Sequence, residues 1–232
     1  MASSPGSTFL LIPGAGGEAW YWHRVTPLLT AAGHRVVAVD LPADDDSVGL
    51  SGYTDLAIDA VGAVDSPLVI VGQSMGAFTA PLIAARIPAD LIVLVNPMVP
   101  RPGESAGQWW ATTGQKAAMA AQFERIGLGR NTFDMIEDFF HDVPDDVRAE
   151  ALATPERQQS DTPFEEPWPL TAWPDVATRV ITGRDDRLFP LEFQRRVTRD
   201  RLGLEVDTVP GGHLVSLSRP DELAHQMLSY LT

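Results

Sequence analysis

Cysteine is absent from this sequence of 232 residues, which excludes disulfides, thiolate catalysis and cysteine-ligated zinc or iron–sulfur sites. Basic residues are scarce, because 17 Lys and Arg stand against 31 Asp and Glu, and Lys116 is the single lysine. The net charge of −14 repels phosphate groups, so we expect neither nucleic acid nor a membrane as a partner. No apolar run approaches the ~20 residues that span a bilayer, and residues 1–8 lack the basic and apolar order of a signal peptide. We therefore expect a cytoplasmic protein.

The most informative stretch of the chain runs from residue 68 to residue 86. A short β-branched run is followed at once by a G-x-S-x-G sequence centred on Ser74, and then by an apolar helical segment. Strand, G-x-S-x-G and helix in succession predict a nucleophile elbow, in which a sharp turn projects the serine hydroxyl above a sheet. Only very small residues fit two positions either side of such a serine, which explains Gly72 and Gly76.

Short apolar strands alternate with helical segments along most of the chain. We predict strands at residues 9–12, 35–39, 68–71, 91–95, 179–182 and 204–209, and helices at residues 20–32, 53–64, 77–86 and 221–230. This alternation is typical of a doubly wound parallel sheet of about six strands, whose ligands bind at the carboxyl ends of the strands. Pro81 lies inside one predicted helix and is expected to kink it.

Residues 99–175 interrupt the alternation with a stretch rich in aromatic residues and proline. Its helical periodicity is clearest at residues 117–126 and 133–140. Because long insertions in compact domains usually serve a function, we predict a helical cap here, with residues 1–98 and 176–232 forming the core. We expect Trp110 and Phe140 to line a substrate pocket under the cap, although such aromatics can equally form the small core of the cap itself.

A nucleophilic serine needs a histidine as general base and a carboxylate that orients it. Among the five histidines, His213 lies in a glycine-rich loop directly after the last predicted strand, where it can reach Ser74. The other four lie in or beside predicted helices and strands or in the insertion: His23, His34, His141 and His225. Asp185 and Asp186 follow the fifth predicted strand, and only one of two successive side chains can face the histidine.

Several segments resemble α/β-hydrolases, and more narrowly the plant methylesterase and hydroxynitrile lyase branch of that family. The resembling segments are Pro13-Gly14-Ala15-Gly16-Gly17, Pro27-Leu28-Leu29, Asp40-Leu41, Leu188-Phe189-Pro190 and Gly211-Gly212-His213. The resemblance covers roughly residues 9–97 and 179–231 and is weak in the insertion. It implies Asp186 as the orienting acid through the pattern G-x-x-D-x-x-x-P, in the chain order serine, acid, histidine. It also implies an oxyanion hole formed by the N–H groups of Ala15 and Met75, while Pro13 replaces the usual histidine.

Two positions distinguish the esterases of this branch from its lyases. Hydroxynitrile lyases of this type carry a lysine directly after the catalytic histidine, which holds the cyanide, and a threonine in the glycine-rich loop. Leu214 and Gly14 stand at these positions of the substrate site. A leucine cannot bind an anion and a glycine has no hydroxyl group, so esterase chemistry is favoured. Dehalogenases and epoxide hydrolases of this fold would need an aspartate in place of Ser74.

We therefore predict a serine hydrolase that cleaves a carboxylic ester of a small, mostly apolar molecule without a cofactor or metal ion. Hydrolysis of a lactone, a thioester or a carbon–carbon bond uses the same residues and stays an alternative. A small-molecule sensor that keeps the hydrolase fold is a second class of function. The sequence does not decide between a monomer and a homodimer.

Overall fold

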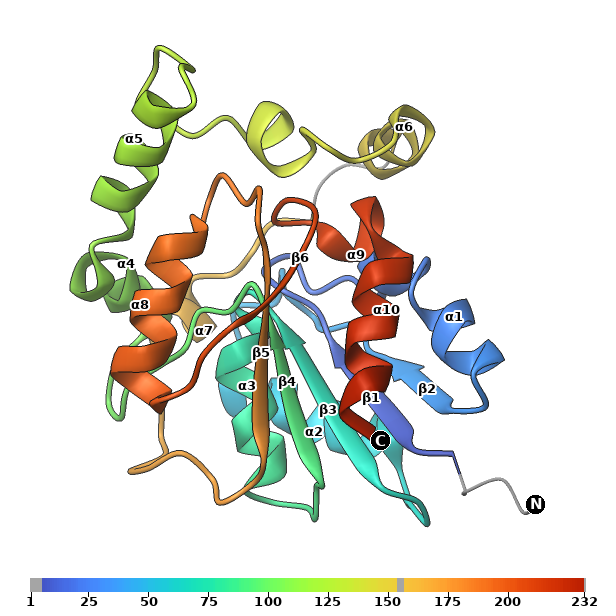
Figure 1. Ribbon diagram of the computed structural model, residues 1–232. Coiled ribbons are helices and arrows are strands. Elements are labelled where there is room, and N and C mark those ends of the chain that lie inside the picture. The colour runs from blue at the N-terminus through green and yellow to red at the C-terminus, as the bar shows by residue number, and fades with distance from the viewer. Residues whose placement is uncertain (1–5, 154–156, 232) are drawn as a thin grey trace.

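The protein, described here as a computed structural model over residues 6–153 and 157–231, contains a six-stranded sheet (Figure 1). The strands are β1 (Thr8–Ile12), β2 (Arg35–Ala38), β3 (Leu68–Gln73), β4 (Leu91–Val95), β5 (Thr178–Gly183) and β6 (Asp207–Val209). Their order is β2-β1-β3-β4-β5-β6, and every neighbouring pair is parallel. The predicted doubly wound parallel sheet is confirmed. Two segments lie outside the described residues: residues 1–5 and residues 154–156 of the insertion. The expectation that the chain starts without a signal peptide rests mainly on the first of them.

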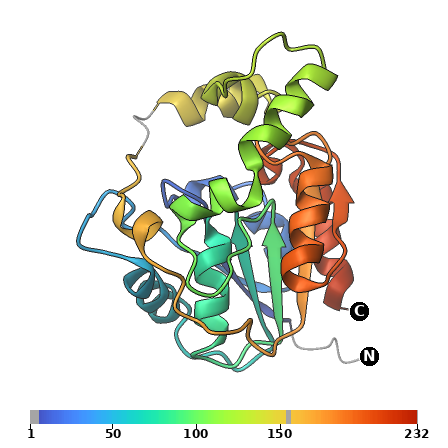
Figure 2. The ribbon, with the colours of Figure 1, turned by 90° about the vertical axis from the view of Figure 1, so that its left-hand side faces the viewer.

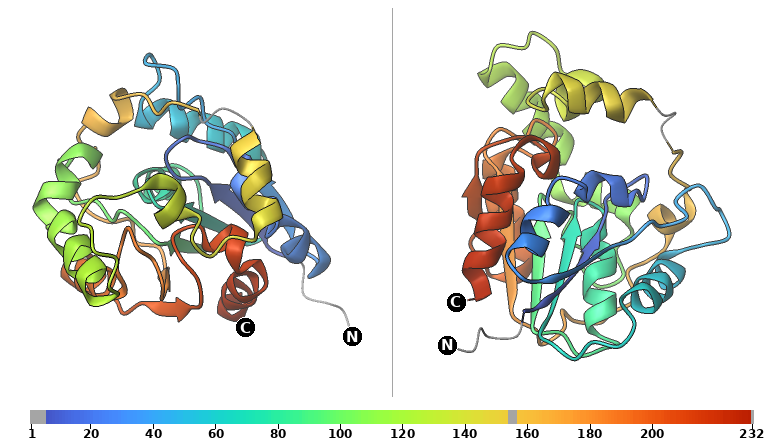
Figure 3. Two further views of the ribbon diagram at one scale, coloured as in Figure 1. Left: turned by 90° about the horizontal axis from the view of Figure 1, so that it is seen from above. Right: turned by 90° about the vertical axis from the view of Figure 1, so that its right-hand side faces the viewer.

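Alternate residues of each strand face opposite sides of the sheet, and each side is covered by helices (Figure 3). In β1, Leu10 and Ile12 belong to one core, whereas Phe9 and Leu11 belong to the other. The first core includes residues of α2 (Leu50–Val61), α3 (Gly76–Ala84) and α8 (Leu191–Leu202). The second includes residues of η1 (Ala19–Trp22), α1 (Thr26–Ala31) and α10 (Pro220–Leu228). Because the strands are apolar on both faces, the sheet lies in the middle of the molecule.

The predicted helix over residues 20–32 is wrong as one element, because the structure splits it into η1 and α1. Pro27 lies near the start of α1 and lacks the N–H that a continuous helix would need there. The helix predicted over residues 53–64 runs instead over α2 and ends at Gly62, whose φ is +60°. By contrast, α3 continues through Pro81. The last strand is shorter than predicted, since only residues 207–209 pair with the end of β5.

The insertion between β4 and β5 forms several short helices. They are α4 (Ala106–Thr113), α5 (Gln115–Arg125), the π-helical turn η2 (Met135–Phe139), α6 (Asp145–Ala153) and α7 (Thr162–Glu165). Figure 2 shows α5 and α6 above the carboxyl ends of the strands. Residues 133–140, predicted as a helix, contain only the five-residue π turn, which the Asp134 carboxylate caps by accepting the Glu137 N–H at 2.8 Å. We refer to residues 99–175 as the cap.

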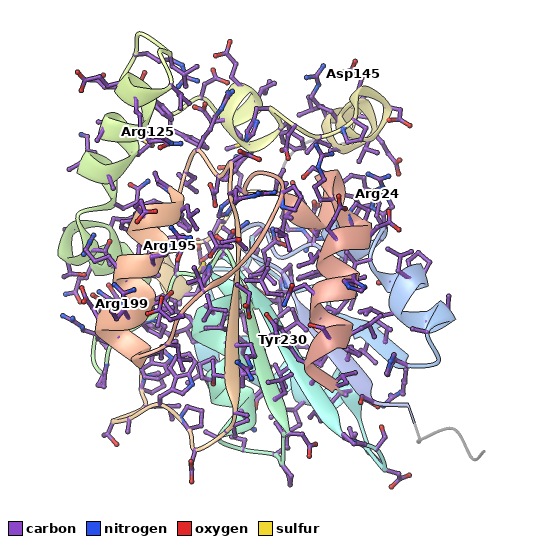
Figure 4. The ribbon with its side chains drawn as sticks, in the orientation of Figure 1. Arg24, Arg125, Asp145, Arg195, Arg199 and Tyr230 are labelled. Atoms are coloured by element: carbon purple, nitrogen blue, oxygen red, sulfur yellow. The ribbon has the colours of Figure 1, made fainter. Side chains whose placement is uncertain are left out.

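Charged side chains lie on the outer faces of α6 and α8. Figure 4 shows Asp145 at the top of the cap and the Arg199 side chain pointing away from the sheet, where it pairs with Glu205 at 2.9 Å. Within residues 6–153 and 157–231, no helix combines the length and the apolar character that a membrane span requires.

Candidate active site

Ser74 lies at the turn between β3 and α3 with a positive φ of 51°. A non-glycine residue is uncommon in this region of backbone conformation, and strained residues of this kind cluster at functional sites. A Cβ added to Gly72 would lie 2.6 Å from the Gly76 carbonyl oxygen, and one added to Gly76 would lie 2.6 Å from the Pro13 carbonyl oxygen. The two glycines therefore allow the strand, the helix and the glycine-rich loop to meet around the serine.

The glycine-rich loop after β1, residues 13–17, lies beside the serine. A Cβ added to Gly14 would be 3.1 Å from Cβ and 3.7 Å from Oγ of Ser74. The loop is closed by the Gly17 N–H, which donates to the Gly14 carbonyl at 3.1 Å. Within the described part of the chain, the amides of Ala15 and Met75 donate to no protein acceptor. Two backbone donors near Ser74 thus remain unused by the protein.

His213 and Asp186 meet on the other side of the site. The imidazole Nδ1 lies 2.8 Å from Asp186 Oδ2, and both side chains are buried. The other carboxylate oxygen, Oδ1, accepts the N–H groups of Leu188 at 2.8 Å and Phe189 at 2.9 Å. Asp185 is exposed and its carboxylate accepts the Gly211 N–H at 3.2 Å. Of the two adjacent acids, Asp186 is therefore the one that faces the histidine.

Two aromatic rings hold the imidazole of His213 from different sides. The Phe139 ring lies at a centroid distance of 5.0 Å with a tilt of 34°, and the Phe189 ring lies edge-on at 5.0 Å. Phe139 comes from the cap and Phe189 from the loop that carries Asp186. These contacts remove water from the ring and strengthen its bond to the carboxylate.

A cavity of about 610 Å³ contains both Ser74 and His213. Its apolar wall comes mainly from the cap and consists of Met135, Phe139, Phe140, Ala151, Leu152, Phe164 and Leu214. Its polar residues include Glu18, Gln73, Arg157, Gln158 and Gln159. Most of the wall is apolar, and a few polar groups are set into it, which is the usual composition of a site for a small organic molecule.

The predicted substrate-binding residues are only partly brought together. Gly14, Phe140 and Leu214 line the cavity, but Trp110 does not. The Trp110 ring packs on Phe189 at 5.6 Å instead, because Phe189 fills the space between it and the histidine. His141 also stays outside, with its ring against the backbone of Gly212.

Sequence reasoning missed Phe139 and the polar residues of segment 157–159. Phe139 stands next to the predicted Phe140, and only the π turn decides that both side chains reach the cavity. Gln159 lies far from the glycine-rich loop in sequence, yet its side-chain oxygen accepts the Gly16 N–H at 3.0 Å. No pattern in the sequence joins segments that are 143 residues apart.

An ion-pair cluster joins the cap to the loop that carries Asp186. Asp138, fully buried, accepts two hydrogen bonds of 2.7 Å from Arg130, and Arg187 lies 3.6 Å away and donates to the Glu137 carbonyl. Burial alone would raise the pKa of Asp138, but the hydrogen bonds from Arg130 and from the Asp134 amide, together with both arginine charges, hold that pKa below its ordinary value. These contacts hold the π-helical turn η2 of the cap beside the loop that carries Asp186.

Known proteins resemble this chain along most of its length. The model of the alpha/beta hydrolase family matches residues 9–226. Esterase PIR7B of Oryza sativa subsp. japonica is 27% identical, in an alignment that covers 96% of this chain and 95% of the relative. An alpha-hydroxynitrile lyase of Arabidopsis thaliana is 34% identical over 100 residues, which are 38% of this chain and 37% of the relative. The crystal structure of polyneuridine aldehyde esterase shares the fold with a TM-score of 0.78 and 22% identity, covering 98% of this chain and 100% of that chain.

Proposed function

This chain belongs to the alpha/beta hydrolase family, and we propose that it is a serine hydrolase that cleaves carboxylic esters of small, mostly apolar molecules. One observation carries the proposal. The cavity that holds the strained Ser74 also holds His213, whose Nδ1 lies 2.8 Å from the buried Asp186 carboxylate. A serine, a histidine and an orienting acid in one cavity are the groups that acyl transfer requires.

In the proposed reaction, Ser74 Oγ attacks the ester carbonyl carbon while His213 Nε2 takes the hydroxyl proton. Asp186 accepts the Nδ1 hydrogen, which keeps Nε2 free as the base and stabilises the imidazolium cation that forms. The carbonyl oxygen becomes an oxyanion and receives the N–H groups of Ala15 and Met75. Each such donor typically contributes ~2.7–4 kcal/mol to the transition state.

The tetrahedral intermediate then collapses, and its carbon–oxygen bond to the alcohol breaks. His213 returns the proton to the leaving alkoxide, and an acyl group stays on Ser74. Water attacks this acyl-enzyme with His213 again as base, which releases the carboxylic acid and restores the serine hydroxyl. The alcohol and the acid are the two products, and one water molecule is consumed.

The composition of the cavity supports an apolar ester as substrate and argues against cyanohydrin cleavage. Leu214 follows His213 directly and lines the cavity, so an apolar side chain lies where a lyase of this branch would hold cyanide. Gly14 offers no hydroxyl group beside Ser74. The rice relative named as an esterase supports the same choice.

A fluorophosphonate probe and a panel of p-nitrophenyl esters test the proposal. We expect the probe to label Ser74, the enzyme to turn the esters over many times, and Ser74→Ala to abolish both while the protein stays folded. Labelling of another residue, or full activity of Ser74→Ala, would refute the assignment. A single stoichiometric acylation without turnover would indicate the small-molecule sensor instead.

A further inference from the structure

Two buried side-chain amides converge on the backbone of the histidine loop. The Asn96 Nδ2 group donates to the carbonyl oxygen of His213 at 2.9 Å and to that of Gly212 at 3.1 Å. Gln73 Nε2 donates to the same His213 carbonyl at 3.2 Å. These bonds reach the main chain of His213, whereas Asp186 reaches its ring, so the residue is held at both ends.

Asn96 also holds the strand that leads to the acid. It follows β4 directly, is fully buried, and its Oδ1 accepts the Gly183 N–H at 2.8 Å. Gly183 is the last residue of β5, and Asp186 lies three residues further along. The three strands β3, β4 and β5 are neighbours in the sheet (Figure 1). The side-chain amide of Asn96 therefore joins the start of the loop that carries Asp186 to the loop that carries His213, here called the histidine loop.

The chemistry of the Asn96 side chain permits only one orientation. Its NH₂ group has two hydrogens and faces two carbonyl oxygens, while its oxygen faces an N–H. A flipped amide would place an oxygen against two oxygens and a donor against a donor. The backbone φ of Asn96 is +44°, a conformation that asparagine adopts more readily than most residues. Both the amide and the backbone therefore favour asparagine here.

Asn96 does not line the cavity and touches no reacting atom. We propose that Asn96 is a positioning residue, which with Gln73 sets the His213 backbone at the distance from Asp186 that lets the ring act as base. This inference rests on the proposed function for its kinetic consequences. The geometry itself, a 2.8 Å bond between His213 Nδ1 and Asp186 Oδ2, can be followed without any substrate.

The sharpest test is Asn96→Asp, which keeps the shape and the acceptor for Gly183 but replaces the NH₂ group with an oxygen. As a carboxylate, that oxygen repels the carbonyls of Gly212 and His213, and as a protonated acid its single hydrogen can serve only one of them, so the loop that carries His213 loses at least one of its two bonds to residue 96. We expect kcat for a p-nitrophenyl ester to fall roughly 10- to 100-fold, because a displacement of about 1 Å at a reacting group can cost about 100-fold. KM should stay within about threefold, because Asn96 lies outside the cavity.

The matched control is Gln194→Glu. Gln194 is fully buried and its Nε2 donates to the carbonyl of Pro97, the residue after Asn96, at 3.1 Å. The change of NH₂ to oxygen opposite a carbonyl is the same, but it does not touch the histidine loop. We expect Gln194→Glu to lower the Tm while kcat stays near that of the wild type.

Proton NMR adds a readout that needs no substrate. The hydrogen between His213 Nδ1 and Asp186 should give a low-field imidazole resonance in the wild type and in Gln194→Glu. We expect Asn96→Asp to weaken or shift this resonance, and Asp186→Asn identifies the signal by removing it. The rate of fluorophosphonate labelling at Ser74 should fall together with the resonance.

A second variant, Asn96→Gly, keeps the positive φ available and covers the case in which Asn96→Asp does not fold. It removes the two donors and the acceptor for Gly183 without adding repulsion, so its kcat should also fall below that of the wild type. The inference is refuted if a folded Asn96 variant keeps the wild-type kcat and resonance, or if Gln194→Glu loses both equally. A wild type that neither cleaves esters nor reacts with the probe refutes the proposed function instead, and the resonance then still tests the positioning role.

Discussion

Replacing Asp186 with asparagine should reverse the tautomer of His213, the proposed general base. Asp186 Oδ1 accepts the N–H groups of Leu188 and Phe189, whereas Oδ2 faces His213 Nδ1 at 2.8 Å. In Asp186→Asn the two backbone donors will hold the amide oxygen at the Oδ1 position, which turns the NH₂ group toward the histidine. His213 Nδ1 must then accept a hydrogen, and the ring proton moves to Nε2, where it blocks the base.

The magnitude follows from the loss of the correct tautomer. In a serine–histidine–aspartate triad this change lowers kcat by about 10⁴-fold, which corresponds to about 5.4 kcal/mol at about 1.36 kcal/mol per tenfold change in rate. We expect a loss of this order for Asp186→Asn, measured as kcat for a p-nitrophenyl ester. Because the two backbone hydrogen bonds persist, the Tm should change little.

Asp185→Asn is the matched control for this substitution. Asp185 is exposed, and its contact is the acceptance of the Gly211 N–H at 3.2 Å, which an asparagine oxygen can maintain. We expect kcat of Asp185→Asn to remain within about tenfold of the wild type, since the tautomer of His213 is untouched. A larger loss for Asp185→Asn than for Asp186→Asn, or wild-type kcat for Asp186→Asn, would show that the reasoning about the acid is wrong.

Three further predictions concern the elbow, the cap and acid stability. Gly76→Ala should lower the free energy of unfolding by roughly 1–3 kcal/mol in a denaturant titration, because its added Cβ lies 2.6 Å from a backbone oxygen; an unchanged midpoint contradicts this. Phe139→Ala should lower kcat/KM for bulky aryl esters by roughly tenfold through lost apolar contact. Trp110→Ala should lower it much less, because Trp110 lies outside the cavity. The opposite ranking would show that the residues of the cavity wall are assigned wrongly. The pKa of Asp138 lies below 3.8 in the folded state, so its contribution to stability is present above pH 3.8 and is lost as the pH falls through the folded pKa. Below pH 3.8 the Tm of the wild type should therefore fall more steeply than that of Asp138→Asn, and parallel curves would argue against the ion-pair cluster.

Several features of the molecule are determined by local sequence. The apolar runs of the strands predict a buried parallel sheet because every residue of such a strand must be covered on one face or the other. The G-x-S-x-G sequence predicts the elbow, and the structure places Ser74 at positive φ between two glycines that have no room for a Cβ. The G-x-x-D-x-x-x-P pattern, read through the family resemblance, selected Asp186, and the structure buries that carboxylate against His213. These features lie within single elements and the loops that follow them.

Only the tertiary structure decided how the separate segments meet. Aromatic residues of the cap look alike in the sequence, but the fold turns Phe139 toward His213 and places Trp110 behind Phe189. The link from Asn96 to the histidine loop spans 117 residues, and the link from Gln159 to the glycine-rich loop spans 143. Hydrogen bonds of this range depend on the order of strands in the sheet and on the path of the cap, which no local pattern encodes. The sequence by itself therefore determined which residues have the chemistry to react, and the packing of distant segments decided which side chains hold them in place.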